Sequence, residues 1–275
     1  YKKWNSNLLR HACKTECVEM VDIIIKLGVK VKKDNRFLHE ACKSGLLDIV
    51  EKLIAAGANP YFIDKRGLLP IHVASKYGHA DIVEMLVRLS LSSLNHISSK
   101  LNSPLFQACK YGRVECVKKL LQLGVSHSIS RYDKFCNREL NVASTYGHTE
   151  VVEELLKSIE YVNQSYDDPE DGSRCSSLHF ACKYGHVGVL MKLIEEGADI
   201  NRKDETKSSP LHYACKYGQL ECFNMLIESG ANVKHLNDYK VTPLQAVCRN
   251  GNIEIFNKLI ILGADIDSKD FKGWT

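Results

Sequence analysis

Histidine and cysteine, the side chains most able to bind a metal ion or attack an electrophile, recur at a nearly regular interval along this chain of 275 residues. His39, His72, His179 and His212 each follow leucine or isoleucine and are followed two positions later by alanine. Zinc and metalloprotease sites use short patterns such as Cys-x-x-Cys or His-Glu-x-x-His, and neither occurs. Phosphate-binding Gly-x-x-x-x-Gly-Lys-Ser/Thr and nucleophilic Gly-x-Ser-x-Gly patterns are also absent. We therefore expect no catalytic, cofactor-binding or metal-binding residue, and no enzyme activity.

Six of the eleven cysteines share one place in the recurring segment, namely Cys13, Cys42, Cys109, Cys182, Cys215 and Cys248. Equivalent side chains in stacked helix layers lie roughly 10 Å apart, whereas a disulfide needs Cα atoms within about 7 Å. We expect these six to be reduced thiols in small buried slots. Reduced thiols indicate an intracellular protein, cytoplasmic or nuclear. Cys136 and Cys175 lie outside the helical pattern, and we expect them to be the most exposed thiols.

The regular interval belongs to an internal repeat that covers nearly the whole chain. Its apolar core positions, separated by 33, 34, 35, 38, 33 and 33 residues, are Leu38, Ile71, Leu105, Leu140, Leu178, Leu211 and Leu244. A glycine follows each of them one helical segment later, as Gly185 follows Leu178 and Gly218 follows Leu211. This pattern resembles the ankyrin repeat, with its 33-residue period and its Thr-Pro-Leu-His-x-Ala signature.

The resemblance implies an all-α repeat solenoid of stacked helix–turn–helix units with β-hairpin fingers and no sheet core. We expect one array over residues 1–275, monomeric and part of a longer chain. Its units are approximately 2–31, 31–63, 64–97, 98–132, 133–170, 171–203, 204–236 and 237–269, with the start of a ninth at 270–275. An acidic insert at 165–172 predicts one lengthened finger, either a plain surface loop or a partner contact.

Local residues fit this arrangement. Pro70, Pro104, Pro210 and Pro243 stand where the first helix of a unit begins, a position that needs no N–H. Ser103, Ser209 and Thr242 precede three of these prolines and can cap the helix. The resemblance implies that the histidine of the signature donates a structural hydrogen bond to a neighbouring loop. His79, His148 and His186 follow the turn glycine, and we expect them to be surface loop residues.

In the ankyrin fold, the two residues before the turn glycine face the concave surface. Here the first is usually basic and the second is often tyrosine, and the set comprises Lys43, Lys76, Tyr77, Lys110, Tyr111, Tyr146, Lys183, Tyr184, Lys216, Tyr217 and Arg249. Acids recur on the second helices, at Glu19, Asp48, Asp81, Glu115, Glu150, Glu221 and Glu254. A net charge of only +4 therefore conceals two unlike faces. Lysine attracts anions at long range and tyrosine supplies rigid contact area.

This face predicts a protein partner with an acidic or phosphorylated segment, recruited by a scaffold or adaptor module. The alternative is that these lysines and tyrosines only keep the surface soluble and pack against each other. Nucleic acid is disfavoured because the face is poor in arginine, and membrane contact is expected only through the parent protein. Two other functions stay open: the cytosolic ankyrin array of a membrane channel, since the cysteine-rich, irregular units resemble those of TRP-type channels, or the substrate-recruiting arm of an enzyme such as a ubiquitin ligase or kinase.

The resemblance also implies a modification. An oxygen-dependent asparagine hydroxylase acts on ankyrin repeats at a hairpin asparagine with a leucine eight residues earlier. Asn163 with Leu155 and Asn201 with Leu193 match this pattern. We expect Asn163 to be the more accessible of the two, because it adjoins the insert. The alternative is that both asparagines hydrogen-bond their own turns.

Overall fold

The computed structural model describes residues 8–15, 17–29, 31, 36–89, 103–124, 138–158, 162–163, 165–167 and 174–275, with only the backbone of 165–167. These residues fall into two compact units, Tyr1–Ile129 and Ser130–Thr275, and each unit is described by itself. The predicted single array over residues 1–275 stays a prediction.

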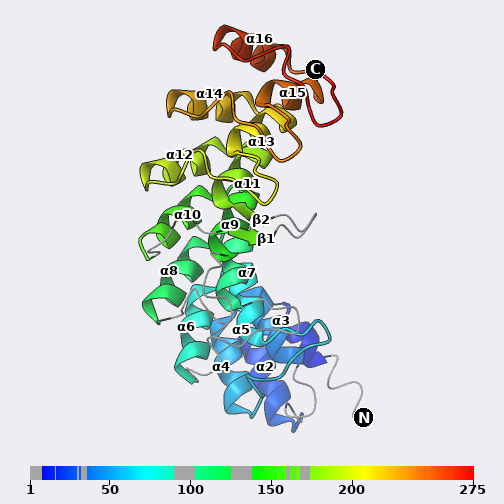
Figure 1. Cartoon of the computed structure of the whole chain (residues 1–275). Helices are drawn as coiled ribbons and strands as arrows, with labels where there is room; N and C mark the ends of the chain where they lie inside the picture. Colours follow the sequence, from blue (N-terminus) through cyan, green and yellow to red (C-terminus); the bar gives the residue numbers. More distant parts are fainter. Residues whose placement is uncertain are drawn as a thin grey trace. The chain divides into compact units, whose positions relative to one another are not determined.

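The first unit is a double layer of short helices joined as helix–turn–helix pairs (Figure 1). Its chain forms a helical turn at 8–12, then α2 (Val18–Lys26), α3 (Arg36–Ser44), α4 (Leu47–Ala55), α5 (Pro70–Tyr77), α6 (Ala80–Leu89), α7 (Pro104–Lys110) and α8 (Val114–Gln122). Helices α3, α5 and α7 pack side by side as the first-helix layer, and α2, α4, α6 and α8 form the second-helix layer. The core lies between the layers, where α4 buries Ile49, Val50 and Leu53 at helical spacing.

The second unit repeats this architecture. It contains α9 (Arg138–Tyr146), α10 (Thr149–Leu156), β1 (Ser165–Asp167), β2 (Arg174–Ser176), α11 (Ser177–Tyr184), α12 (Val187–Glu195), α13 (Pro210–Tyr217), α14 (Leu220–Glu228), α15 (Pro243–Cys248) and α16 (Ile253–Ile261). Helices α9, α11, α13 and α15 form the first-helix layer, and α10, α12, α14 and α16 form the second (Figure 1). The predicted ankyrin architecture is confirmed.

The predicted helix starts are confirmed, but at one of them a histidine ring caps the helix instead of the expected serine. Ser103 Oγ accepts the N–H of Phe106 at 2.9 Å, and Thr242 Oγ1 accepts the N–H of Gln245 at 3.1 Å. Ser209 differs, because its hydroxyl lies 2.9 Å from Nδ1 of His212. The same ring nitrogen also accepts the N–H of Ser209 at 3.2 Å, so the histidine closes the cap.

The turn glycines are required for two reasons. Gly185 has a φ of +76°, the left-handed region that favours glycine. A Cβ on Gly185 would also meet the Gln219 side chain of the next repeat. A Cβ on Gly147 would likewise clash with the ring of His186. The next repeat therefore lies directly over each of these turns.

The insert forms the only β-ladder in the described part of the chain. Strands β1 and β2 pair antiparallel, with Ser165 opposite Ser176 and Asp167 opposite Arg174. The ladder is the base of the predicted lengthened finger, and residues 168–173 lie outside the described residues.

The thiol predictions are partly wrong. Cys13, Cys42, Cys109, Cys182 and Cys215 are buried, as expected. Cys175 is buried rather than exposed, because β2 places its sulfur 3.1 Å from the hydroxyl of Tyr213. Cys248 is exposed rather than buried, because no described first helix packs on the outer side of α15. Cys136 lies outside the described residues.

Candidate functional site

The signature histidines are internal struts, as the resemblance implies. Nε2 lies 2.9 Å from the Leu68 carbonyl in His39, 3.1 Å from the Ser208 carbonyl in His179, and 3.0 Å from the Val241 carbonyl in His212. Each bond ties a first helix to the finger that follows it. Burial lowers the pKa of His179 and of His212 to about 4, so both rings are neutral at pH 7.

One further repeat varies this strut. His72 keeps the cap at its own helix start, where its Nδ1 accepts the N–H of Leu69 at 3.2 Å, as Nδ1 of His212 accepts that of Ser209. Gln245 takes the histidine place in α15, where its Nε2 donates to the carbonyls of Ser268 at 2.8 Å and Trp274 at 3.1 Å. The amide therefore fixes the last finger as the imidazoles fix the others.

A second set of struts was missed by the sequence analysis. The residue after the turn glycine reaches back to the previous repeat and donates to a carbonyl two residues before that repeat's own glycine. The bonds are His79 Nε2 to Lys43 at 3.0 Å, Arg113 Nε to Lys76 at 3.0 Å, His186 Nε2 to Thr145 at 3.0 Å and Gln219 Nε2 to Lys183 at 3.4 Å. His79 and His186 are therefore not plain surface loop residues. The sequence could have indicated these struts, because a side chain with a hydrogen-bond donor follows the turn glycine in successive repeats.

These struts hold the backbone of the residues expected to bind. In the first unit the side chains form a Lys/Tyr ladder, defined as Lys43, Lys76, Tyr77, Lys110 and Tyr111. Nζ of Lys76 lies 5.6 Å from the ring centroid of Tyr77 and 4.7 Å from that of Tyr111. Nζ of Lys43 lies 5.5 Å from the Tyr77 centroid, and Nζ of Lys110 lies 6.0 Å from the Tyr111 centroid. Cation–π contacts thus join successive repeats.

The second unit continues the pattern less evenly. Lys183 is only 7% exposed, so it does not present its charge as expected. Its Nζ lies 5.3 Å from the Tyr184 centroid and 6.0 Å from that of Tyr217, and these rings cover it. Tyr146 and Arg249 are exposed, and Nζ of the exposed Lys216 lies 5.1 Å from the Tyr217 centroid.

Lysines of the second-helix layer are placed differently. Lys119 lies 2.7 Å from Glu84, and this hydrogen bond lowers the pKa of that carboxyl. Lys192 lies 3.1 Å from both Glu153 and Glu195. By contrast, Lys43 and Lys76 have no carboxylate within ion-pair distance among the described residues. The acids predicted for this layer are all exposed, at Glu19, Asp48, Asp81, Glu115, Glu150, Glu221 and Glu254.

The second unit also contains a groove of about 560 Å³ between its first helices and its fingers. The finger residues share one clamp, in which an acidic or amide oxygen accepts two backbone N–H groups of its own turn. Oδ1 of Asp204 accepts from Thr206 and Ser208, both at 2.8 Å. Oδ1 of Asn237 accepts from Tyr239 at 3.0 Å and Val241 at 2.9 Å.

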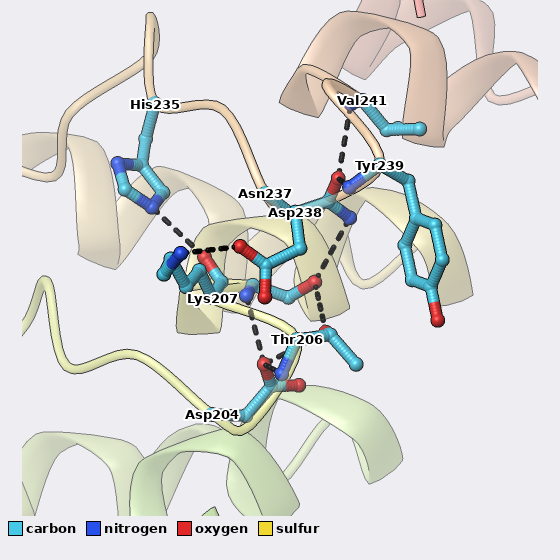
Figure 2. A network of polar contacts seen from close by, with 9 residues as sticks. Asp204, Thr206, Lys207, His235, Asn237, Asp238, Tyr239 and Val241 are labelled. Atoms are coloured by element: carbon cyan, nitrogen blue, oxygen red, sulfur yellow. Dashed lines mark hydrogen bonds and ion pairs between the residues drawn. The ribbon is translucent and has the colours of Figure 1, made fainter. Parts of the chain in front are cut away.

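Neighbouring fingers are also bonded to each other (Figure 2). The N–H of Asp238 donates to the Thr206 carbonyl at 2.8 Å, and the Asp238 carboxylate pairs with Lys207 at 2.5 Å. Nε2 of His235 donates to the Lys207 carbonyl at 2.8 Å. The ring of Tyr239 points away from this polar network (Figure 2), and Tyr239 is one of the residues that line the groove.

The two hairpin asparagines join successive fingers instead of closing their own turns. Oδ1 of Asn163 accepts the N–H of Asp199 at 2.6 Å, and Oδ1 of Asn201 accepts the N–H of Asn232 at 2.9 Å. In the folded chain Asn163 is half-buried and Asn201 is exposed. That the hairpin of Asn163 opens more easily stays a prediction.

The repeats, struts and fingers define an ankyrin array, and the comparison with protein families agrees. The family model for ankyrin repeats matches in three copies, at residues 38–131, 128–204 and 178–270. The chain belongs to the ankyrin-repeat family. Ankyrin repeats are generally protein–protein interaction modules, and no catalytic family is indicated.

Individual relatives include channels. The chain is 27% identical over 199 residues to transient receptor potential cation channel subfamily A member 1 of Drosophila melanogaster, a match over 66% of this chain and 16% of the channel. The human member of that name is 27% identical over 139 residues, a match over 50% of this chain and 12% of the channel. The match therefore spans less than a fifth of either channel. Among the described residues, no helix has the length and apolar composition of a membrane-spanning segment.

Among solved structures, the chain is similar to the ankyrin repeat domain of human ASB11. The TM-score is 0.70 at 26% sequence identity, and the match covers 83% of this chain and 98% of that domain.

Proposed function

We propose that this chain is a non-enzymatic scaffold or adaptor module of an intracellular protein, cytoplasmic or nuclear. It recruits a protein partner through an acidic or phosphorylated segment that lies along its finger side. The Lys/Tyr ladder of the first unit carries the proposal. Lys76 is held between two rings with no carboxylate partner in the described part of the chain, so its charge is available to a ligand. Stacking on tyrosine also limits the side-chain entropy that binding removes.

A matched pair of double variants tests this proposal. Lys43→Gln with Lys76→Gln removes two charges from the ladder. Lys52→Gln with Lys119→Gln removes two charges from the second helices, where each lysine already pairs with a carboxylate. The probe is fluorescein-labelled poly-glutamate, followed by anisotropy at low salt because screening weakens such contacts. We expect the ladder variant to lose about tenfold in affinity and the control less than about twofold. Equal losses would show that only net charge matters and would refute the ladder.

A second candidate function is the ankyrin array of a membrane channel. The supporting observation is the 27% identity to the Drosophila channel over 66% of this chain. Sequencing the parent transcript tests it: several membrane-spanning segments after residue 275 would support the channel, and a transcript encoding none would reject it. A parent chain with a ligase or kinase domain would instead support the substrate-recruiting function.

We also propose Asn201 as a hydroxylation site, with Asn163 as the weaker one. The enzyme must draw the hairpin out as an extended strand, so the cost depends on the bonds that break. Asn201 Oδ1 holds one N–H, of Asn232, whereas Asn163 holds Asp199 and also donates to the Gly197 carbonyl at 3.4 Å. Incubation with the hydroxylase, oxygen, iron and 2-oxoglutarate should add one oxygen atom to the Asn201 peptide. No gain there, while a control ankyrin array is modified, would reject the site.

A further inference from the structure

The groove of the second unit is more cationic than its composition suggests. Its lining holds two carboxylates, and both are used by the protein itself. Besides its two backbone donors, Asp204 accepts the Tyr213 hydroxyl on Oδ2 at 2.9 Å. Asp270 accepts the N–H groups of Lys272 at 2.8 Å and Trp274 at 3.0 Å. These bonds occupy the carboxylate oxygens and hold them against the fingers.

The cations of the groove are not used in this way. Lys216, Arg249 and Lys272 line it and are exposed. None of the three has an ion pair with a carboxylate among the described residues. Arg249 lies two residues before the turn glycine of its repeat, so the groove includes one of the basic residues that the sequence predicted to bind. The charges left to face a ligand are therefore positive.

The same groove exposes aromatic rings. Tyr239, Phe271 and Trp274 are 52%, 58% and 72% exposed. The centroids of Tyr239 and Phe271 lie 5.9 Å apart, which fixes the two rings against each other. The last finger is held by the two hydrogen bonds from Gln245 and by the N–H of Phe271, which donates to the Tyr239 carbonyl at 3.1 Å. Rigid aromatic side chains in a small pocket are typical of interface anchors.

Two lysines in the fingers that form the groove have a strained backbone conformation. Lys207 and Lys240 have φ values of +58° and +56°, where the corresponding finger position elsewhere is Gly67 or Gly273. The left-handed conformation is sterically disfavoured for a non-glycine residue. The strain at Lys207 is offset within the protein, because its side chain pairs with the Asp238 carboxylate. Lys240 has no carboxylate partner among the described residues, and it stands between Tyr239 and Val241, which both line the groove.

We propose that this groove binds a short acidic peptide segment with one large apolar side chain. The apolar side chain lies against Tyr239, Phe271 and Trp274, and the flanking carboxylates face Lys216, Arg249 and Lys272. A volume of about 560 Å³ accommodates a few side chains rather than a single ion. The inference rests on the proposed protein-binding function and assigns to it a specific position and a partner class.

A random-peptide display library, selected on the whole chain, tests the proposal. We expect enriched peptides to combine one phenylalanine, tyrosine, tryptophan or leucine with neighbouring aspartates or glutamates. Synthetic copies labelled with fluorescein are then titrated against four variants by anisotropy. Two are the groove variant, Lys216→Gln with Arg249→Gln, and the aromatic variant, Phe271→Ala. The other two are the ladder variant, Lys43→Gln with Lys76→Gln, and the matched control on the second helices, Lys52→Gln with Lys119→Gln, whose lysines already pair with carboxylates. Circular dichroism verifies that each variant keeps its melting temperature.

The groove variant should weaken binding about tenfold and Phe271→Ala about fivefold, whereas the second-helix control should change it less than about twofold. Replacing the apolar residue of the peptide by serine should remove the effect of Phe271→Ala. Peptides that lose affinity only with the ladder variant would overturn the groove and leave the proposed function standing. Enrichment without acidic residues, or no enrichment at all, would count against both.

Discussion

Lysines in the two helix layers differ in what surrounds their ammonium groups. In the first-helix layer, Nζ of Lys76 lies over two tyrosine rings, at 5.6 and 4.7 Å from their centroids. In the second-helix layer, Lys192 bridges Glu153 and Glu195 at 3.1 Å each. The second layer thus neutralises part of its own charge, whereas Lys43, Lys76 and Lys216 of the first layer have no carboxylate partner in the described part of the chain. A modest net charge can therefore conceal unpaired lysines in one helix layer, because the partners of each lysine matter more than the number of lysines.

The first-helix layer also contains buried, neutral histidines. Their protonation at low pH should have the largest effect on stability. Burial lowers the pKa of His179 and His212 from 6.5 to about 4. The unfolded chain therefore binds protons that the folded chain does not as pH falls from 6.5 toward 4, and stability is lost over that range. At pH 5 each histidine should cost about 2 kcal/mol. Hydrogen exchange at pH 7 and pH 5 should show selective loss of protection in α11 and α13.

The chain supplies the control for this prediction. Gln245 makes the same strut in α15 without a titrating group. His212→Gln should keep the hydrogen bond to the Val241 carbonyl and remove about half of the acid destabilisation. An unchanged pH dependence in this variant would contradict the role assigned to His212.

The rates at which two thiols of the first-helix layer can be labelled should give the next largest difference. Cys182 is a fully buried free thiol of the second unit, whereas Cys248 is exposed at the end of α15. Labelling of Cys182 requires local opening, which should slow it by on the order of a hundredfold relative to Cys248. Alkylation under native conditions, followed by peptide mass spectrometry, measures both rates. Similar rates would show that the helices around Cys182 open far more easily than their packing indicates.

Finger strain should give a smaller effect. Lys240→Gly relieves a φ of +56° and should stabilise the second unit by about 1 kcal/mol. Lys207→Gly should gain less, since it also loses the ion pair with Asp238. Thermal unfolding of the two variants compares them directly. A larger gain for Lys207→Gly would mean that its ion pair does not offset the strain.

Much of the fold could be predicted from the sequence because the repeat carries it. The period, Pro210 and Gly218 define helix and turn without reference to the rest of the molecule. The contacts between repeats could not be read in this way. The covering of Lys183 by two tyrosines, the burial of Cys175 under Tyr213 and the bond from Asn201 to the next finger all depend on how repeats stack. The groove likewise requires three fingers at once, and its aromatic residues lie at different places in each repeat.

The central claim is that first-helix lysines face the partner and second-helix lysines do not. Lysine footprinting tests it most directly: the chain is acetylated briefly with and without saturating poly-glutamate, and each site is quantified by mass spectrometry. The account predicts that Lys43, Lys76 and Lys216 are protected about fivefold or more, while Lys52, Lys119 and Lys258, already paired with side chains of the second layer, change less than about twofold. Equal protection of both sets, or stronger protection of the second, would contradict it.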